Sequence, residues 1–192
     1  MPWDDDDFMG LLRILALDLM ETYEHLQLDQ HHQPARRTWV RTFCSQVEAV
    51  AFGTKQLLAE FSVLPYVQIT PHELILLREE EVDVDDKGNV NVHPKKFLSP
   101  KKNLLFLAGI VTRGLGADFR LDKADHGWEA LNKTFAIRNR LVHPKRAADL
   151  VVTDEELGVV STAQDWFQKM HLDLARAIET TLRTKGPQRG AP

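Results

Sequence analysis

The chain of 192 residues has little cysteine, and that scarcity excludes whole classes of protein. Cys44 is the one thiol, so no intramolecular disulfide can form and a disulfide-stabilised fold is excluded. A reducing compartment such as the cytoplasm is therefore expected. Cys44 falls within a helical pattern, where a small buried side chain is a simpler interpretation than a nucleophile.

Long apolar runs are also lacking. The longest run, from Leu104 to Val111, is much too short to cross a bilayer. The first residues include four consecutive aspartates, Asp4 to Asp7, whereas a secretory signal peptide begins with basic residues. The sequence therefore predicts a soluble cytoplasmic protein that does not enter membranes.

An excess of positive charge is lacking, since 24 lysines and arginines face 28 aspartates and glutamates and the formal net charge is −4. This balance argues against charge-driven coating of nucleic acid, which usually requires a basic domain. The charge is uneven, however, because residues 133–148 contain no acidic side chain. Such a positive window favours a focused anion site, and its titratable or cationic residues are Lys133, Arg138, Arg140, His143, Lys145 and Arg146.

Several familiar site motifs are missing. There is no glycine-rich phosphate loop, no serine-centred elbow and no paired-carboxylate motif. Residues 83–94 imitate the start of a calcium loop, but Lys87 occupies a ligand position and Pro94 replaces the closing glutamate. His25, His31 and His32 are not joined by cysteines or carboxylates at ligand spacing. We therefore expect neither a metal nor another cofactor.

What the chain does have is apolar residues at intervals of three and four, which predict amphipathic helices. Gly53 lies inside one of these patterns without breaking it. Thr153 and Glu156 form a capping box at the start of the longest helix. The predicted helices cover about residues 4–30, 34–61, 71–80, 101–113, 128–142 and 153–182.

Residues 81–92 change to a period of two. Valines alternate with polar residues on both sides of an Asp-Asp-Lys-Gly turn, which predicts a β-hairpin. The predicted fold is all-α, an up-and-down helical bundle of four to five main helices with this hairpin inserted near 81–92. We expect one domain over residues 1–185 and a flexible tail over 186–192.

Residues 138–145, Arg-Asn-Arg-Leu-Val-His-Pro-Lys, close the helix that begins near Trp128. A purely structural interpretation is available, because an arginine complements the dipole of a helix end and a histidine can cap it. Yet Arg138 follows Phe135 by three on a predicted buried face, where an arginine needs a cleft, a partner or an anion. Pro144 disfavours helical geometry at His143, so the imidazole should leave the helix. The predicted buried face consists of Trp128, Leu131, Phe135 and Val142.

Arg138, Asn139 and His143, placed before a long C-terminal helix, resemble the signature of HEPN domains. That family includes many metal-independent endoribonucleases of toxin–antitoxin, antiphage and CRISPR systems. The resemblance covers the motif and the helical layout of about the C-terminal half, and not the segment at 81–92. It implies a homodimer in which two motifs face one cleft, and RNA as the partner.

The resemblance also implies roles for individual residues. His143 would act as acid or base, Arg138 would hold the phosphate oxygens, and Asn139 would position either group. Some toxins of the family carry a tyrosine two residues after the histidine, where a partner enzyme modifies it. Lys145 stands there in this chain, although an antitoxin or regulatory protein remains an expected partner.

Further residues are candidates for RNA contacts or support. Arg140, Lys145 and Arg146 are predicted to bind the RNA backbone, and Lys133 is more simply a solvated cation. Glu48 could reach the site as a carboxylate partner, although a solvated helix face is the simpler interpretation. A second basic patch binds RNA or a partner, or merely solubilises the surface, and consists of Lys95, Lys96, Lys101 and Lys102.

Two other functions remain open alongside the nuclease. The chain could be a non-catalytic helical bundle that binds RNA, a nucleotide or a protein partner through the same arginine. It could also be an interaction module in which the motif is buried for stability.

Overall fold

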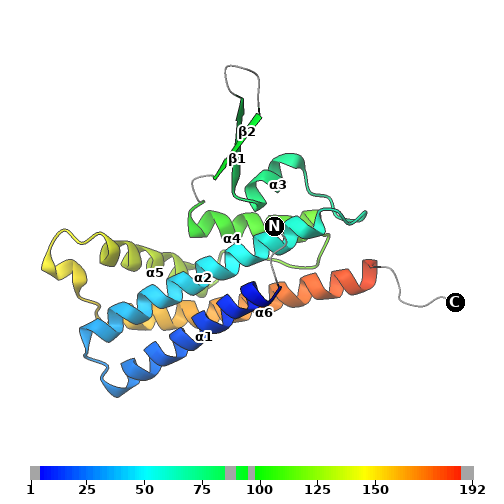
Figure 1. Ribbon diagram of the computed structural model, residues 1–192. Coiled ribbons are helices and arrows are strands. Elements are labelled where there is room, and N and C mark those ends of the chain that lie inside the picture. The colour runs from blue at the N-terminus through cyan, green and yellow to red at the C-terminus, as the bar shows by residue number, and fades with distance from the viewer. Residues whose placement is uncertain (1–4, 85–89, 95–97, 187–192) are drawn as a thin grey trace. The chain divides into compact units, whose positions relative to one another are not determined.

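The computed structural model describes residues 5–84, 90–94 and 98–186 (Figure 1). The predicted helical fold class is confirmed. Short π-helical and 3₁₀ segments, η1 (Ile110–Gly114) and η2 (Ala147–Leu150), follow two of the α-helices. The α-helices are α1 (Asp5–Leu28), α2 (Gln33–Phe61), α3 (Pro71–Leu77), α4 (Pro100–Gly109), α5 (His126–Val142) and α6 (Asp154–Lys185).

Local sequence signals set the helix boundaries. The predicted capping box of α6 is present, since the Thr153 amide donates to Glu156 at 3.1 Å and the Glu156 amide to the Thr153 hydroxyl at 3.2 Å. Asp125 caps α5 by accepting the amide of Gly127 at 2.7 Å. Gly53 is buried inside α2, which continues past it as predicted.

Two strands, β1 (Glu80–Val84) and β2 (Val90–Pro94), lie between α3 and α4 and pair antiparallel (Figure 1). Val82 is opposite Val92 in this register. The turn predicted at 85–88 lies outside the described residues. The helix before the strands is shorter than predicted, because Glu79 takes a left-handed backbone with φ of 56° and ends α3.

The chain divides into two compact units. The first consists of Met1–Val50 and Asp122–His171, and so holds α1, α5, η2 and the N-terminal parts of α2 and α6. Its core includes Phe43, which meets Phe167 edge to face at a centroid distance of 6.2 Å. A Cβ on Gly127 would lie 2.1 Å from the Trp166 side chain, so only glycine lets α5 begin this close to α6.

The second unit consists of Ala51–Leu121 and Leu172–Pro192. Its core is apolar, with Leu77, Leu107 and Ile110 at most 1% exposed. Lys55 is also 1% exposed, and its ammonium pairs with the Glu79 carboxylate at 2.7 Å. None of the helices in the described residues is both long enough and apolar enough to span a bilayer. The single domain over 1–185 stays a prediction, and residues 187–192 of the predicted tail lie outside the described residues.

The buried face of α5 differs from the predicted one. Trp128, Leu131 and Phe135 are buried, but Val142 is 45% exposed, so its assignment to the core is wrong. The buried stripe instead continues through Ile137 and Leu141, which follow Thr134 by three and seven. Consequently residue 138 lies at the edge of the stripe and not along its centre.

Candidate functional site

The predicted site residues lie at the C-terminal end of α5. His143 is the C-cap: its φ of −122° and ψ of 57° are not helical, and its amide donates to the Asn139 carbonyl at 3.0 Å. The predicted helix end is confirmed, and its physical cause is Pro144. The imidazole is exposed, and among the described residues none hydrogen-bonds it. It is therefore accessible to a ligand.

Arg138 carries out the central interaction of the site. Its Nη2 donates to both carboxylate oxygens of Glu48, at 2.9 and 3.2 Å, and its Nη1 donates to the Asn139 side-chain oxygen at 3.1 Å. The arginine and the glutamate side chains are 29% and 37% exposed. The anion that the position of Arg138 requires is thus supplied by α2. Glu48 therefore reaches the site as a carboxylate partner, while its side chain stays partly open to solvent.

Cys44 lies one helical turn before Glu48 on α2 and is fully buried. Burial raises the pKa of its thiol to about 12, although the Arg138 charge lowers it and the Glu48 charge raises it further. The thiol stays protonated at neutral pH and has no access to solvent. The interpretation of Cys44 as a small core residue is confirmed.

Arg140 is engaged within the fold. Its Nη1 donates to the carbonyls of Asp149 and Val151 at 3.0 and 2.8 Å, and its Nη2 to both oxygens of Glu156 at 2.8 Å. Four bonds thereby join the end of α5 to η2 and the first turn of α6. An RNA contact by Arg140 stays a prediction, while its structural role is plain from the geometry.

The loop after His143 is folded around Asp149. This carboxylate accepts the amides of Lys145 at 2.9 Å and Arg146 at 3.2 Å, and the Arg146 guanidinium at 3.2 Å. These hydrogen bonds, led by the Lys145 amide, lower the pKa of Asp149. The side chains of Lys145 and Arg146 are exposed. Lys133 pairs on the surface with Glu129, one turn away, at 2.9 Å.

The sequence interpretation missed a group of α2 residues that hold the same loop. The Gln33 side chain donates to the Val152 carbonyl at 3.0 Å and accepts the Val152 amide at 2.8 Å. Arg36, 4% exposed, donates to that carbonyl at 2.7 Å and to Asp154. Arg37 donates to the Leu150 carbonyl at 3.1 Å, and Arg41 to the Leu141 carbonyl at 2.8 Å. In the sequence these residues show only the spacing of one helix face, and that spacing does not indicate which segment of the chain packs against the face.

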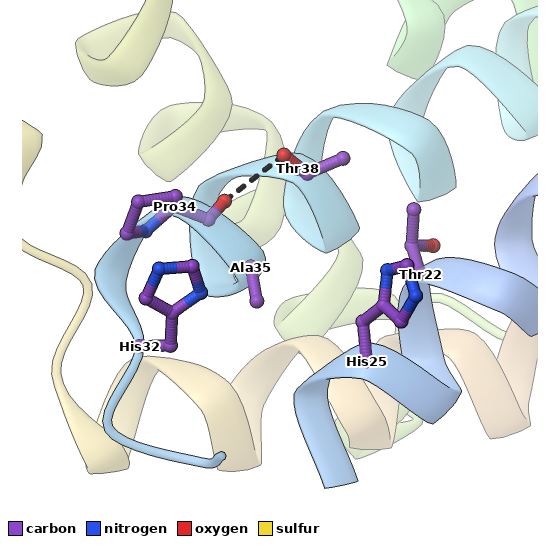
Figure 2. A pocket seen from close by; sticks show the side chains of 6 residues that line it. All are labelled: Thr22, His25, His32, Pro34, Ala35 and Thr38. Atoms are coloured by element: carbon purple, nitrogen blue, oxygen red, sulfur yellow. Dashed lines mark hydrogen bonds between the residues drawn. The ribbon is translucent and has the colours of Figure 1, made fainter. Parts of the chain in front are cut away.

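A separate pocket of about 340 Å³ lies in the same unit, between the end of α1 and the start of α2. Figure 2 shows the imidazoles of His25 and His32 on either side of Ala35. The hydroxyls of Thr22 and Thr38 donate to carbonyls of their own helices. Along α2, Thr38 and Glu48 are ten residues apart, roughly 15 Å. The pocket is therefore distinct from the Arg138 site.

The described part of the chain contains no group of three or more histidine, cysteine, aspartate or glutamate side chains that could hold a metal ion. Of the second basic patch, Lys101 and Lys102 are exposed near the start of α4. Lys95 and Lys96 lie outside the described residues.

Comparison of the chain with family models, with curated proteins and with solved structures finds no match. The resemblance to HEPN domains therefore depends on Arg138, Asn139, His143 and the helical layout alone.

Proposed function

We propose that the chain is a HEPN-type endoribonuclease that cleaves RNA without a metal ion and serves as a toxin or antiphage defence effector. One observation carries the proposal: a half-exposed guanidinium, fixed by Glu48 and Asn139, lies on the helical turn that ends at an exposed imidazole. Together these groups supply a cation for phosphate oxygens and an imidazole that can accept or donate a proton.

The proposed reaction uses the substrate's own 2′-hydroxyl. Its oxygen attacks the adjacent phosphorus, a base takes its proton, and the bond from phosphorus to the 5′-oxygen breaks. An acid gives the leaving oxygen a proton, so that the products are a cyclic phosphate and a 5′-hydroxyl. His143 acts as the base or the acid, and Arg138 holds the non-bridging oxygens as negative charge develops.

Arg138 retains donors for this task. A guanidinium has five N–H donors, and the bonds to Glu48 and Asn139 use at most three of them. Glu48 prevents the side chain from rotating away, so less entropy is lost when a phosphate binds. Asn139, which accepts from Arg138, keeps its own amide donors for the phosphate or for His143.

A homodimer belongs to the proposal, because one chain offers a single motif histidine whereas the reaction needs both an acid and a base. The finer architecture belongs to it as well: an up-and-down bundle, with residues 81–92 as an inserted hairpin. The cytoplasm is the proposed location, and an antitoxin or regulatory protein is a proposed partner.

The test is cleavage of a labelled random-sequence RNA pool in EDTA by the full chain. We expect His143→Ala and Arg138→Ala each to lower the cleavage rate by about 100-fold or more. His126→Ala is the matched control, because His126 is an exposed histidine at the opposite end of the same helix. The products should carry cyclic phosphate, and DNA of matched sequence should stay intact.

Circular dichroism and thermal unfolding show whether each variant is folded. Full cleavage by folded His143→Ala overturns the assignment of the imidazole. Cleavage that is lost equally in His126→Ala points to a general loss of structure. RNA binding without cleavage by the wild type supports the second candidate.

That second candidate is a non-catalytic helical protein that binds RNA, a nucleotide or a protein partner. The pairing of Arg138 with Glu48 favours it, because an arginine already matched to a carboxylate can be purely structural. In this case His143→Ala would leave binding of the RNA pool unchanged.

A further inference from the structure

Several cations around the loop after α5 are matched by carboxylates of the chain itself. Arg138 pairs with Glu48 at 2.9 Å and Arg140 with Glu156 at 2.8 Å. Arg146 pairs with Asp149 at 3.2 Å. Each pair is electrically neutral, so it attracts a phosphate less than an unpaired cation does.

Two arginines of α2 differ from these pairs. Arg37 and Arg41 donate to main-chain carbonyls, those of Leu150 and Leu141, at 3.1 and 2.8 Å. A carbonyl orients the side chain but does not cancel its charge. No carboxylate among the described residues forms an ion pair with either arginine. Lys145, whose side chain is exposed, has no such partner there either.

The two arginines lie along one stripe of α2. Residues 37, 41 and 48 are spaced by four and seven, so they share a face that leads toward the Arg138–Glu48 pair. Arg37 and Arg41 are about 6 Å apart along the helix axis. Arg41 is exposed and reaches the carbonyl of Leu141, two residues before His143, while Arg37 is half-buried at the far end of the loop.

We infer that Arg37 and Arg41, together with Lys145, form a binding track for the phosphates of the RNA strand that flank the cleaved bond. The inference rests on the proposed nuclease function. Each guanidinium donates one N–H to a carbonyl, and its remaining N–H groups can form two hydrogen bonds to a phosphate. The track supplies affinity without base recognition, and Arg138 and His143 carry out the reaction.

The test measures binding of the labelled RNA pool to the His143→Ala chain at several salt concentrations. Arg37→Gln and Arg41→Gln remove the charge and keep a polar side chain, whose amide lies closer to the main chain than the Nη atoms that meet the carbonyls. Each should weaken binding and lower the slope of log K against log salt by about 0.7. Lys145→Ala should act the same way, and it cannot unfold the loop through a lost side-chain bond. Arg120→Gln, which changes an exposed arginine of the other compact unit, should have no effect.

The results distinguish a failure of the phosphate track from a failure of the proposed nuclease function. Cleavage by the wild type together with unchanged salt slopes in all three track variants overturns the track and leaves the nuclease standing. A wild type that neither binds nor cleaves RNA overturns both. Lower affinity in the track variants, with an unchanged cleavage rate at saturating RNA, supports a binding role and excludes a catalytic one.

Discussion

The Arg138–Glu48 pair of the first compact unit and the Lys55–Glu79 pair of the second are nearly equal in length, 2.9 and 2.7 Å. They differ in their access to water. The side chains of the first pair are 29% and 37% exposed, and those of the second only 1% and 13%. A buried ion has no alternative partner, whereas a half-exposed one can exchange its partner for water or for an anion. A buried ion pair can thus stabilise a core, whereas a similar pair that is open to solvent can take part in binding a ligand.

Removing one member of the buried pair should have the largest effect on stability. Glu79→Gln leaves the Lys55 ammonium buried without a counter-charge, and we expect a loss of about 3–5 kcal/mol in the free energy of unfolding. Urea unfolding measures this loss. Glu60→Gln, an exposed site on the same helix as Lys55, serves as the control and should stay within about 0.5 kcal/mol of the wild type. A loss below about 1 kcal/mol for Glu79→Gln would remove the basis of the comparison.

Arg140→Ala tests a pair about as accessible as Arg138–Glu48 but tied to more groups, since the Arg140 and Glu156 side chains are 30% and 27% exposed. We expect the free energy of unfolding to fall by about 2 kcal/mol, because the variant also loses the hydrogen bonds to the carbonyls of Asp149 and Val151. Limited trypsin digestion at Lys145 and Arg146 should become faster as the loop loosens. Arg176→Ala, which breaks an exposed pair on α6, should leave digestion at these two sites unchanged.

Glu48→Gln should change stability by only about 0.2–1 kcal/mol, as expected for an accessible pair. The variant should lower the rate of RNA cleavage by more than this small loss of stability would explain, because Arg138 loses the carboxylate that orients it. Thermal unfolding and the EDTA cleavage assay together measure the two effects. A stability loss as large as that of Glu79→Gln would show that the two pairs do not differ in kind.

The smallest expected effect concerns pH. Hydrogen bonding from Arg113 lowers the pKa of Glu73 below its ordinary value of 4.5. The ionised carboxylate is therefore favoured by the fold, and its contribution is present above pH 4.5 and is lost as the pH falls through the lowered pKa. Because Arg113 is 61% exposed, solvent screening keeps the contribution small. Glu73→Gln should flatten the acid limb of a plot of stability against pH, and a steeper limb would contradict the assignment.

The helices could be predicted well because their signals are local. The Thr153–Glu156 capping box and the stop at Pro144 act within a few residues, and both are present. The π-helical segment at Ile110–Gly114 was not predicted, since the apolar pattern of residues 104–111 fits a regular helix equally well. The exposure of Val142 was missed for a related reason: a face inferred from period alone is uncertain by one position.

The candidate site could be predicted only in part. Arg138, Asn139 and His143 are neighbours in sequence, so their grouping was visible as a motif. Glu48 and Arg41 reach the same region from positions 90 and 100 residues away in the chain. No spacing rule indicates such partners, because they are brought together by packing in three dimensions. Glu48 was named as a possible carboxylate partner, but its spacing could not distinguish that role from a solvated helix face, and the contact of Arg41 was not foreseen.

The reciprocal contact between Gln33 and Val152 has a practical consequence for engineering. The glutamine amide meets the main chain at residue 152 as a neighbouring β-strand would, with one donor and one acceptor. It anchors the connection just before α6 begins, independently of the length of chain upstream. An insertion between Ala147 and Ala148 would split η2 and separate Asp149 from the Lys145 and Arg146 amides, but the Gln33 contact should still hold the residue before α6. Gln33→Glu, in contrast, would put a carboxylate against the Val152 carbonyl and release this anchor.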